Sequence, residues 1–219
     1  MVRPRIKETD NGIQGSFDIR VFDKMRRKMR DSNHLDTDHL IKSGIDHGLA
    51  LEIGPGPGYL GLEWLHKTND TTLKAVEISQ GMIHLAEHNA DEYNLRDRVT
   101  YIPGDAKDLP FKDGGFDAVF SSGSLHEWAE PLRIFNEIYR VLKSGGKYYI
   151  SDLRRDLNPI IKFLIVKSTE SREIIPRFIT SLQAAYTKKE LEIIIAESML
   201  KEAIIKNNPV DLEITGLKK

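Results

Sequence analysis

Three glycines at alternate positions follow an apolar stretch and precede an amphipathic segment. The residues are Leu51-Glu52-Ile53-Gly54-Pro55-Gly56-Pro57-Gly58-Tyr59-Leu60. This pattern predicts a β-strand, a tight turn and the start of a helix. Glycine has no Cβ and lets a ligand approach the backbone, while a helix N-terminus offers unpaired N–H groups. The segment therefore predicts a loop that binds a nucleotide-like ligand, and the alternative is a tight turn with no ligand.

The spacing of these glycines disfavours an NAD or FAD site. A dinucleotide-binding fingerprint requires G-x-G-x-x-G. Counting from Gly54, Tyr59 occupies the position of its last glycine. The chain instead carries E-x-G-x-G-x-G between Glu52 and Gly58.

Acidic residues stand at the ends of the next two predicted strands. The segment 74–78 carries Glu77, 19 positions after Gly58. An ionised carboxylate there can accept hydrogen bonds from both hydroxyls of a ribose; the alternative is a solvated glutamate at a strand end. The segment 99–102 is followed by Asp105, which by itself is an ordinary turn residue.

The order of elements predicts an α/β fold with a parallel sheet. Apolar segments at 116–122 and 141–150 alternate with helical patterns at 80–93 and 131–142. Such alternation is typical of right-handed βαβ units.

The C-terminal part predicts a helix and a hairpin. Thr187 and Glu190 have the spacing of a capping box, and the helix is expected to extend to residue 200. Two short strands follow at 203–206 and 212–215, separated by a turn-like segment. They are expected to form an antiparallel hairpin.

Over roughly residues 47–217 the chain resembles the class I S-adenosylmethionine (SAM) dependent methyltransferases, in particular the small-molecule enzymes related to quinone and sterol methyltransferases. The resemblance rests on E-x-G-x-G-x-G, the acidic strand ends, Phe116-Asp117-Ala118-Val119 and the Gly145-Gly146 turn. It implies a Rossmann-like, doubly wound, seven-stranded, mostly parallel sheet with a C-terminal antiparallel hairpin and a helical lid. It also implies SAM as cofactor, S-adenosylhomocysteine as product, and Asp105 as acceptor from the adenine amino group. The cofactor-binding residues it implies are Glu52, Gly54, Gly56, Gly58, Glu77, Ile78, Met82, Gly104, Asp105, Ala106, Ser121 and Ser122.

We expect one domain over residues 1–219, because this length suits a single α/β unit. Its parts would be an N-terminal helical cap (1–47), the SAM-binding core (48–150), a lid insertion (151–186) and a C-terminal helix with hairpin (187–219). The middle of the insertion, 159–167, is too apolar for a free loop and too short to span a bilayer. It predicts a lid helix, with a dimer contact or a lipid-facing surface as alternatives.

Four residues outside the predicted cofactor loops are candidates for substrate binding. Phe22 stands where the related enzymes carry the tyrosine of an F-D-x-x-x-Y-D motif. Trp128 could offer a π-face or be a core residue. Arg154 could hold an anionic substrate or form a salt bridge, and Tyr186 could face the substrate or be buried. The basic residues between 24 and 30 are expected to form a solvated helix face and not an anion site.

His126 is the candidate catalytic base. It follows the predicted strand 116–122, and imidazole has a reference pKa of about 6.5 that suits proton removal near neutrality. A packing or hydrogen-bonding role is the alternative.

Composition limits the remaining possibilities. The net charge is −1 and the chain has no cysteine, so we expect no nucleic-acid partner, no thiolate chemistry and no metal. Without a long apolar segment or a secretion signal, we expect a cytoplasmic protein with no membrane span, either a monomer or a homodimer.

The sequence favours in-line transfer of a methyl group from SAM to a small-molecule acceptor. The loop Ser121-Ser122-Gly123-Ser124 lacks the Asn/Asp-Pro-Pro-aromatic sequence typical of enzymes that methylate the amino groups of bases or glutamine. The alternatives are a protein or RNA methyltransferase and a SAM-binding protein without methyl transfer.

Overall fold

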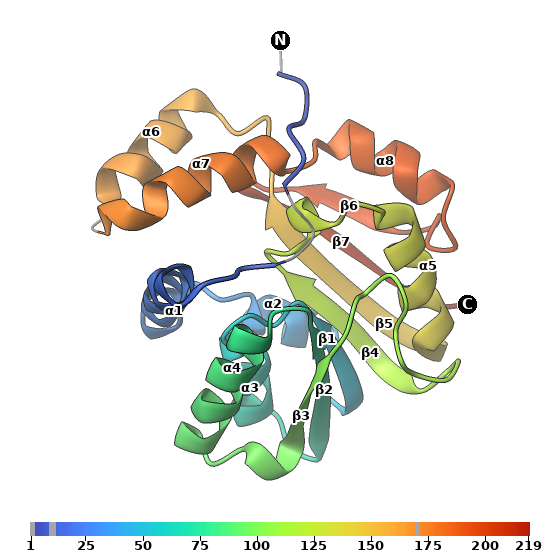
Figure 1. Cartoon of the computed structure of the whole chain (residues 1–219). Coiled ribbons are helices and arrows are strands. Elements are labelled where there is room, and N and C mark those ends of the chain that lie inside the picture. Colours follow the sequence, from blue (N-terminus) through green and yellow to red (C-terminus); the bar gives the residue numbers. More distant parts are fainter. Residues whose placement is uncertain (1–2, 9–11, 170) are drawn as a thin grey trace.

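The fold is a twisted seven-stranded sheet with helices on both faces (Figure 1). The computed structural model describes residues 3–8, 12–169 and 171–219. Parts of the predicted N-terminal cap (1–2 and 9–11) and one residue of the predicted lid (170) lie outside this range. The strands are β1 (Gly48–Ile53), β2 (Thr71–Glu77), β3 (Val99–Pro103), β4 (Phe116–Ser122), β5 (Leu142–Leu153), β6 (Ile204–Asn207) and β7 (Asp211–Leu217).

The helices follow the predicted order. They are α1 (Ser16–Asp31), α2 (Thr37–Lys42), α3 (Tyr59–Lys67), α4 (Gln80–Glu92), α5 (Pro131–Val141), α6 (Pro159–Ser168), α7 (Ile175–Ala184) and α8 (Lys188–Ala196). Short 3₁₀ turns are η1 (Arg96–Arg98), η2 (Leu125–Glu127) and η3 (Arg172–Ile174). The capping box before α8 is present, with Thr187 and Glu190 bonded in both directions. The helix is shorter than predicted, because it ends at Ala196 and a turn precedes β6.

The strand order places a crevice at the centre of the sheet. The order is β3-β2-β1-β4-β5-β7-β6. Strands β1 to β5 are parallel, while β7 runs antiparallel to both β5 and β6. The direction of winding reverses between β1 and β4, and open α/β sheets bind ligands at the carboxyl ends of strands on either side of such a reversal. The predicted fold class is therefore confirmed.

Two buried apolar clusters hold the helices to the sheet. One includes Trp64, Phe120 and Tyr149 and lies under α2, α3 and α4. The other includes Phe135 and Leu191 and lies under α5 and α8 (Figure 1). The buried indole N–H of Trp64 donates to the carbonyl of Ile45 at 2.7 Å, so this polar group has a hydrogen-bond partner inside the core.

The insertion after β5 is helical, as predicted. Its first helix, α6, has no buried side chain, and Ile160, Phe163 and Leu164 are exposed. The second helix, α7, packs against η2. In the described part of the chain no helix combines the length and the apolar character needed to cross a bilayer.

The N-terminal segment crosses the carboxyl edge of the sheet. Arg5 donates to the carbonyls of Ala184 and His126, and the Ile6 amide donates to Gln183 at 3.1 Å. Further along, Ile13 is buried and its carbonyl accepts from the Ser79 hydroxyl at 2.6 Å. The described residues of this segment are therefore bonded to the rest of the fold.

Gly58 is expected to be indispensable for the junction between β1 and α3. It has φ of +82°, and an added Cβ would lie 2.5 Å from the Tyr101 hydroxyl and 3.2 Å from Ala86 Cβ. Left-handed backbone and overpacking together should cost Gly58→Ala about 2–4 kcal/mol of unfolding free energy. Gly145→Ala is the control, because Gly145 has φ of +78° with open space around it. Urea denaturation should show a clearly smaller loss for Gly145→Ala; equal losses would mean that the close contacts are unimportant.

Candidate functional site

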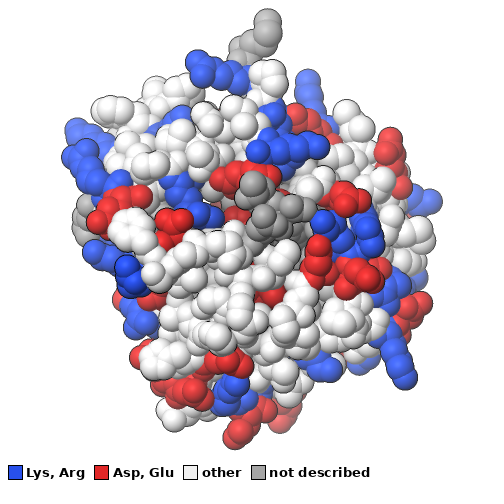
Figure 2. All heavy atoms as spheres, in the orientation of Figure 1, with Lys and Arg blue, Asp and Glu red and all other residues white. Residues whose placement is uncertain are grey.

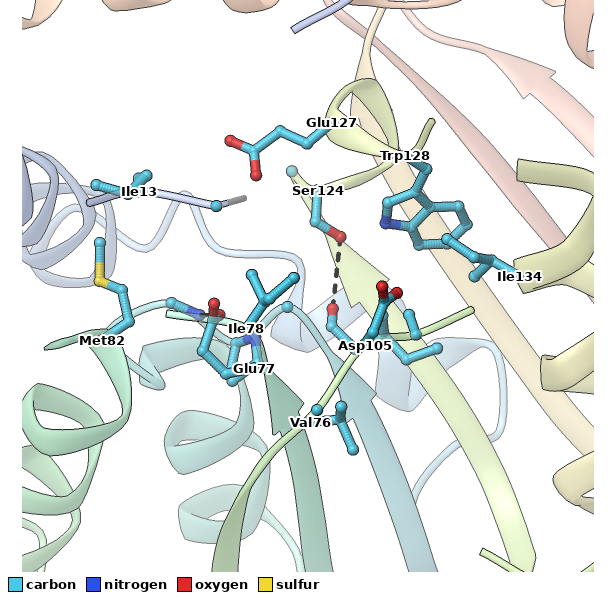
Figure 3. A pocket seen from close by; sticks show the side chains of 18 of the residues that line it. Ile13, Val76, Glu77, Ile78, Met82, Asp105, Ser124, Glu127, Trp128 and Ile134 are labelled. Atoms are coloured by element: carbon cyan, nitrogen blue, oxygen red, sulfur yellow. Dashed lines mark hydrogen bonds between the residues drawn. The ribbon is translucent and has the colours of Figure 1, made fainter. Parts of the chain in front are cut away.

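A cavity lies at the carboxyl ends of β1 to β4, where the sequence predicts the ligand site (Figure 3). The loops after these strands form its floor and walls, and the N-terminal segment with α1 closes one side. The lining residues include Gly12, Ile13, Phe22, Arg26, Gly54, Gly56, Glu77, Ile78, Met82, Gly104, Asp105, Ala106, Ser122, Ser124, Glu127 and Trp128. None of the described residues of the predicted lid 151–186 belongs to this lining. From the N-terminal segment, Gly12 and Ile13 belong to the lining.

The glycine loop meets its surroundings closely. Gly54 and Gly56 have φ of +65° and +54°. A Cβ on Gly54 would lie 2.8 Å from Ser124 Cβ, and one on Gly56 would lie 3.2 Å from the Phe22 ring. These two glycines therefore let the loops after β1 and β4 and helix α1 converge on one space.

Glu77, at the end of β2, ties the glycine loop to the start of α4. Its carboxylate accepts from the Gly56 amide at 3.1 Å and from the Ser79 amide at 2.9 Å. Burial raises the pKa of Glu77, while these N–H groups act in the opposite direction. The Ile78 amide also acts on this carboxylate, and because a carboxylate has about four acceptor positions, capacity remains for a hydroxyl donor in the cavity.

A second carboxylate, that of Asp105, faces apolar side chains across the cavity. Asp105 follows β3, accepts from the Lys107 amide at 2.9 Å and has a side chain that is 41% exposed. Ile78 and Met82 lie across the cavity from it (Figure 3). An apolar slot with a carboxylate at its edge suits a flat aromatic ring that carries an amino group.

Arg26 is a functional candidate that the sequence analysis assigned to a solvated face. It is buried on α1, lines the cavity, and has charge interactions with Asp36 and Glu52. Among the described residues its guanidinium makes no hydrogen bond. The error has a simple origin: Arg26 lies four residues after Phe22, so both share one face of α1, and that face is turned inward.

Three predicted cofactor residues do not line the cavity. Glu52 is buried beneath the loop, where burial raises its pKa to about 8 against the charge of Arg26. Gly58 begins α3, and Ser121 donates to the Ile53 carbonyl at 2.8 Å. These residues support the loops from below. The remaining predicted cofactor residues all belong to the lining.

The predicted substrate residues divide into two groups. Phe22 and Trp128 line the cavity, and Trp128 also packs edge-on against Phe135. Arg154 instead forms an ion pair with Asp156 at 2.8 Å. Tyr186 is buried, with its hydroxyl donating to the Trp128 carbonyl and Arg5 stacked on its ring. Neither Arg154 nor Tyr186 lines the cavity. Arg154 instead forms the salt bridge, and Tyr186 is the buried aromatic side chain, that were given as their alternatives.

His126 is buried in η2 and does not line the cavity. Its Nδ1 lies 2.9 Å from the Asp152 carboxylate, which also accepts from the His126 amide at 2.6 Å. Burial alone would lower the pKa of His126, but the charge and hydrogen bond of Asp152 outweigh it and raise the pKa to about 9. An imidazole that is already protonated at neutral pH cannot remove a proton there. The geometry therefore counts against the predicted base role.

Glu127 lies in the cavity, at the place where the sequence predicts the side chain of His126. Its carboxylate reaches into the cavity near Ser124 and Ile13 (Figure 3). The His126 Nε2 lies 3.9 Å from it and an Arg177 nitrogen 3.5 Å. Burial raises the pKa of Glu127 to about 6, while these two cations act in the opposite direction. The sequence offers only adjacency to His126 as a signal for this residue.

Comparison with known proteins agrees with the fold and the position of the cavity. The mostly parallel sheet with this strand order and a glycine loop after β1 defines an α/β protein with a ligand cavity at the carboxyl ends of its strands. Residues 51–150 match the family model for the methyltransferase domain. The structure superposes on a proposed SAM-dependent methyltransferase from Methanococcus maripaludis with a TM-score of 0.67 and 25% identity, covering 100% of this chain and 97% of the other. The chain is thus similar to SAM-dependent methyltransferases in its central part and in its fold.

Two curated relatives illustrate the range of activities near this sequence. The chain is 29% identical to the demethylmenaquinone methyltransferase of Lactobacillus johnsonii over 74% of its own length and 61% of the relative's. It is also 29% identical to the biotin biosynthesis bifunctional protein BioHC of Teredinibacter turnerae over 68% of its length. The match spans only 28% of BioHC. In both cases the chain covers less than two thirds of the relative.

The Asp152–His126 pair should make stability depend on alkaline pH. The folded-state pKa of His126, about 9, exceeds the unfolded value of about 6.5. Its contribution is therefore complete below pH ~6.5 and is lost as the pH rises through ~9, in total about 2–3 kcal/mol. Chemical denaturation across this range should show a steeper decline for the wild type than for His126→Gln. His47→Gln is the control, because the side chain of His47 is 74% exposed; parallel curves for wild type and His126→Gln would contradict the assignment.

Proposed function

We propose that this chain transfers the methyl group of SAM to a small-molecule acceptor. When bound, SAM supplies a methyl group on a positively charged sulfur, and its transfer needs no acid to assist the leaving group. The observation that carries the proposal is one cavity lined by the glycine loop, a buried arginine and three carboxylates, those of Glu77, Asp105 and Glu127. The arginine and the first two carboxylates match, in chemical type, the polar ends of such a ligand.

The chemistry of the lining fits SAM group by group. Glu77 is suited to accept from the ribose hydroxyls, and Asp105 to accept from the adenine amino group beside the apolar Ile78 and Met82. The guanidinium of Arg26 is suited to pair with the carboxylate of the methionine portion, because two N–H groups can bind both oxygens. Ser122, the last residue of β4, also lines the cavity, and its hydroxyl donates to Asp36 at 2.7 Å.

The size of the cavity implies movement on binding. Its volume is about 100 Å³, whereas pockets for ligands of drug size measure about 300–1,000 Å³. Ile13 fills part of the space between Glu127 and Glu77 (Figure 3). Because Ile13 lies in the cavity, residues 12–15 are the part that we expect to shift when the site fills, with loss of the hydrogen bond from Ser79.

The character of the surface favours a small acceptor over a nucleic acid. Acidic and basic side chains are interspersed over the face shown in Figure 2, and the net charge of the chain is −1. A nucleic-acid site needs a concentrated basic patch. The names of relatives that act on menaquinone precursors, rifamycin and erythromycin support the same class of acceptor.

The acceptor class is tested by product analysis. The protein is incubated with methyl-labelled SAM and with a cell extract separated by molecular mass. We expect label to enter the low-mass fraction and S-adenosylhomocysteine to form in equal amount. Label in protein or RNA would replace the proposal with the macromolecular alternative, and no transfer in any fraction would favour a SAM-binding protein without methyl transfer.

The role of Arg26 is tested with two ligands that differ in one group. Arg26→Met should weaken S-adenosylhomocysteine binding by about 1.5–3 kcal/mol, because one charge-assisted pair is lost. Binding of methylthioadenosine, which has no carboxylate, should be unchanged. Calorimetry with Lys24→Met as the control on the same helix, where Lys24 is exposed, separates local from general effects. Equal losses for both ligands would show that Arg26 supports the fold and not the carboxylate.

A further inference from the structure

We propose that Glu127 faces the methyl acceptor and takes its proton, and that His126 and Arg177 position its carboxylate. The inference rests on the proposed function, since it concerns the second half of the same cavity. It also names the substrate class: an acceptor whose reacting atom carries a removable proton, such as a hydroxyl, phenol or enol.

The lining of the cavity divides into groups suited to SAM and one carboxylate, that of Glu127, that is left over. Glu77, Asp105 and Arg26 have chemistry suited to the parts of SAM, which leaves Glu127 as a carboxylate of the lining with no cofactor group to serve. It stands on η2, which follows β4, and its carboxylate points toward the side of Ile13, whereas the ring of Trp128 points away from it (Figure 3). Only 21% of the Glu127 side chain is exposed, which limits water around the carboxylate, and a base acts best where water is limited.

Two cations from different elements lie against the Glu127 carboxylate. Arg177 of α7 lies 3.5 Å from its Oε1, and His126 Nε2 of η2 lies 3.9 Å from the same atom. The N-terminal segment brings Glu8, whose carboxylate is 3.5 Å from His126 Nε2. Asp152 fixes the other ring nitrogen of His126 at 2.9 Å. His126 thereby acts as a fixed cation between carboxylates, a positioning residue that does not touch the cavity.

The charges around Glu127 oppose one another. His126 and Arg177 favour its ionised form, while Glu8 and the more distant Glu77 disfavour it, and burial disfavours it most. The balance leaves the pKa of Glu127 at about 6. Such a carboxylate is ionised at neutral pH and still basic enough to take a proton, which is the compromise that general-base catalysis favours.

The step balances without any further reactant. The acceptor X–H gives its proton to the Glu127 carboxylate, which becomes a carboxylic acid. The electron pair of X forms the new bond to the methyl carbon, and the carbon–sulfur bond breaks with its pair retained by sulfur. The products are X–CH₃ and S-adenosylhomocysteine, and Glu127 later releases its proton to water.

Ligand affinity tests the position of Glu127 without an identified acceptor. SAM carries a positive sulfur and S-adenosylhomocysteine a neutral one, so an ionised carboxylate at the methyl end should favour SAM. Calorimetry gives the affinity for SAM divided by the affinity for S-adenosylhomocysteine. In the wild type this ratio should rise about 3-fold to 30-fold between about pH 5 and about pH 8. In Glu127→Gln the ratio should stay constant. Glu130→Gln is the matched control in the same loop, since the side chain of Glu130 is 56% exposed.

Turnover tests the proton transfer itself. With methyl-labelled SAM and the low-mass extract fraction as probe, wild-type kcat/KM should rise with pH through an apparent pKa near 6. Glu127→Gln should lower kcat/KM by about 100-fold to 10,000-fold and should abolish its rise with pH. His126→Gln removes a neighbouring cation, so it should move the rise to higher pH while S-adenosylhomocysteine still binds.

The outcomes separate this inference from the proposed function. An unchanged affinity ratio in Glu127→Gln, or retained turnover with the same pH profile, would overturn the role of Glu127 while leaving methyl transfer intact. A wild type without transfer to any fraction would overturn the proposed function, and the pH-dependent ratio would still report whether Glu127 faces the sulfur.

Discussion

The buried carboxylate of Glu77 organises the whole carboxyl edge of the sheet. It accepts from the glycine loop after β1 through Gly56 and from the start of α4 through Ser79. Ser79 in turn donates to Ile13 and accepts from the Met82 amide, so the N-terminal segment and α4 are joined at the same point. A carboxylate is the only side-chain group that can accept from several N–H donors and carry charge at once. The geometry of the cavity depends on this interaction more than on any one apolar contact.

The sequence predicts this edge well because its signals are local. Strand ends, the glycine loop and the capping box at Thr187 are encoded within a few residues, and each one is found in the structure. The chain reverses its winding between β1 and β4, so residues at successive strand ends are brought to one place without any need to predict long contacts. Glu77 and Asp105 are found in the cavity for this reason.

The errors concern groups whose role depends on packing between distant segments. The basic residues of α1 predict a solvated face, yet Arg26 is turned inward and Arg30 stacks on Tyr59 at 4.9 Å. His126 has a suitable reference pKa, but Asp152, 26 residues away, holds its proton. The spacing of residues along the chain does not show which face of a helix is buried. It also does not show which charged residue from a distant segment will lie beside a given side chain. The loop after β4 is therefore found at the cavity as predicted, but His126 itself does not line the cavity, whereas its neighbour Glu127 does.

The cavity is built from two parts of the chain. The glycine loop, Glu77, Asp105 and Glu127 all fall within residues 51–150, the part that matches the methyltransferase domain. Outside it, α1 supplies Phe22 and Arg26, and the preceding segment supplies Ile13, while Glu8 of that segment contacts His126. A match confined to the central part carries information on cofactor binding and little on the acceptor, because the groups that enclose Glu127 come from the N-terminal segment and α7. Relatives that share the domain can therefore differ in acceptor while they keep the same arrangement of strands and the same glycine loop.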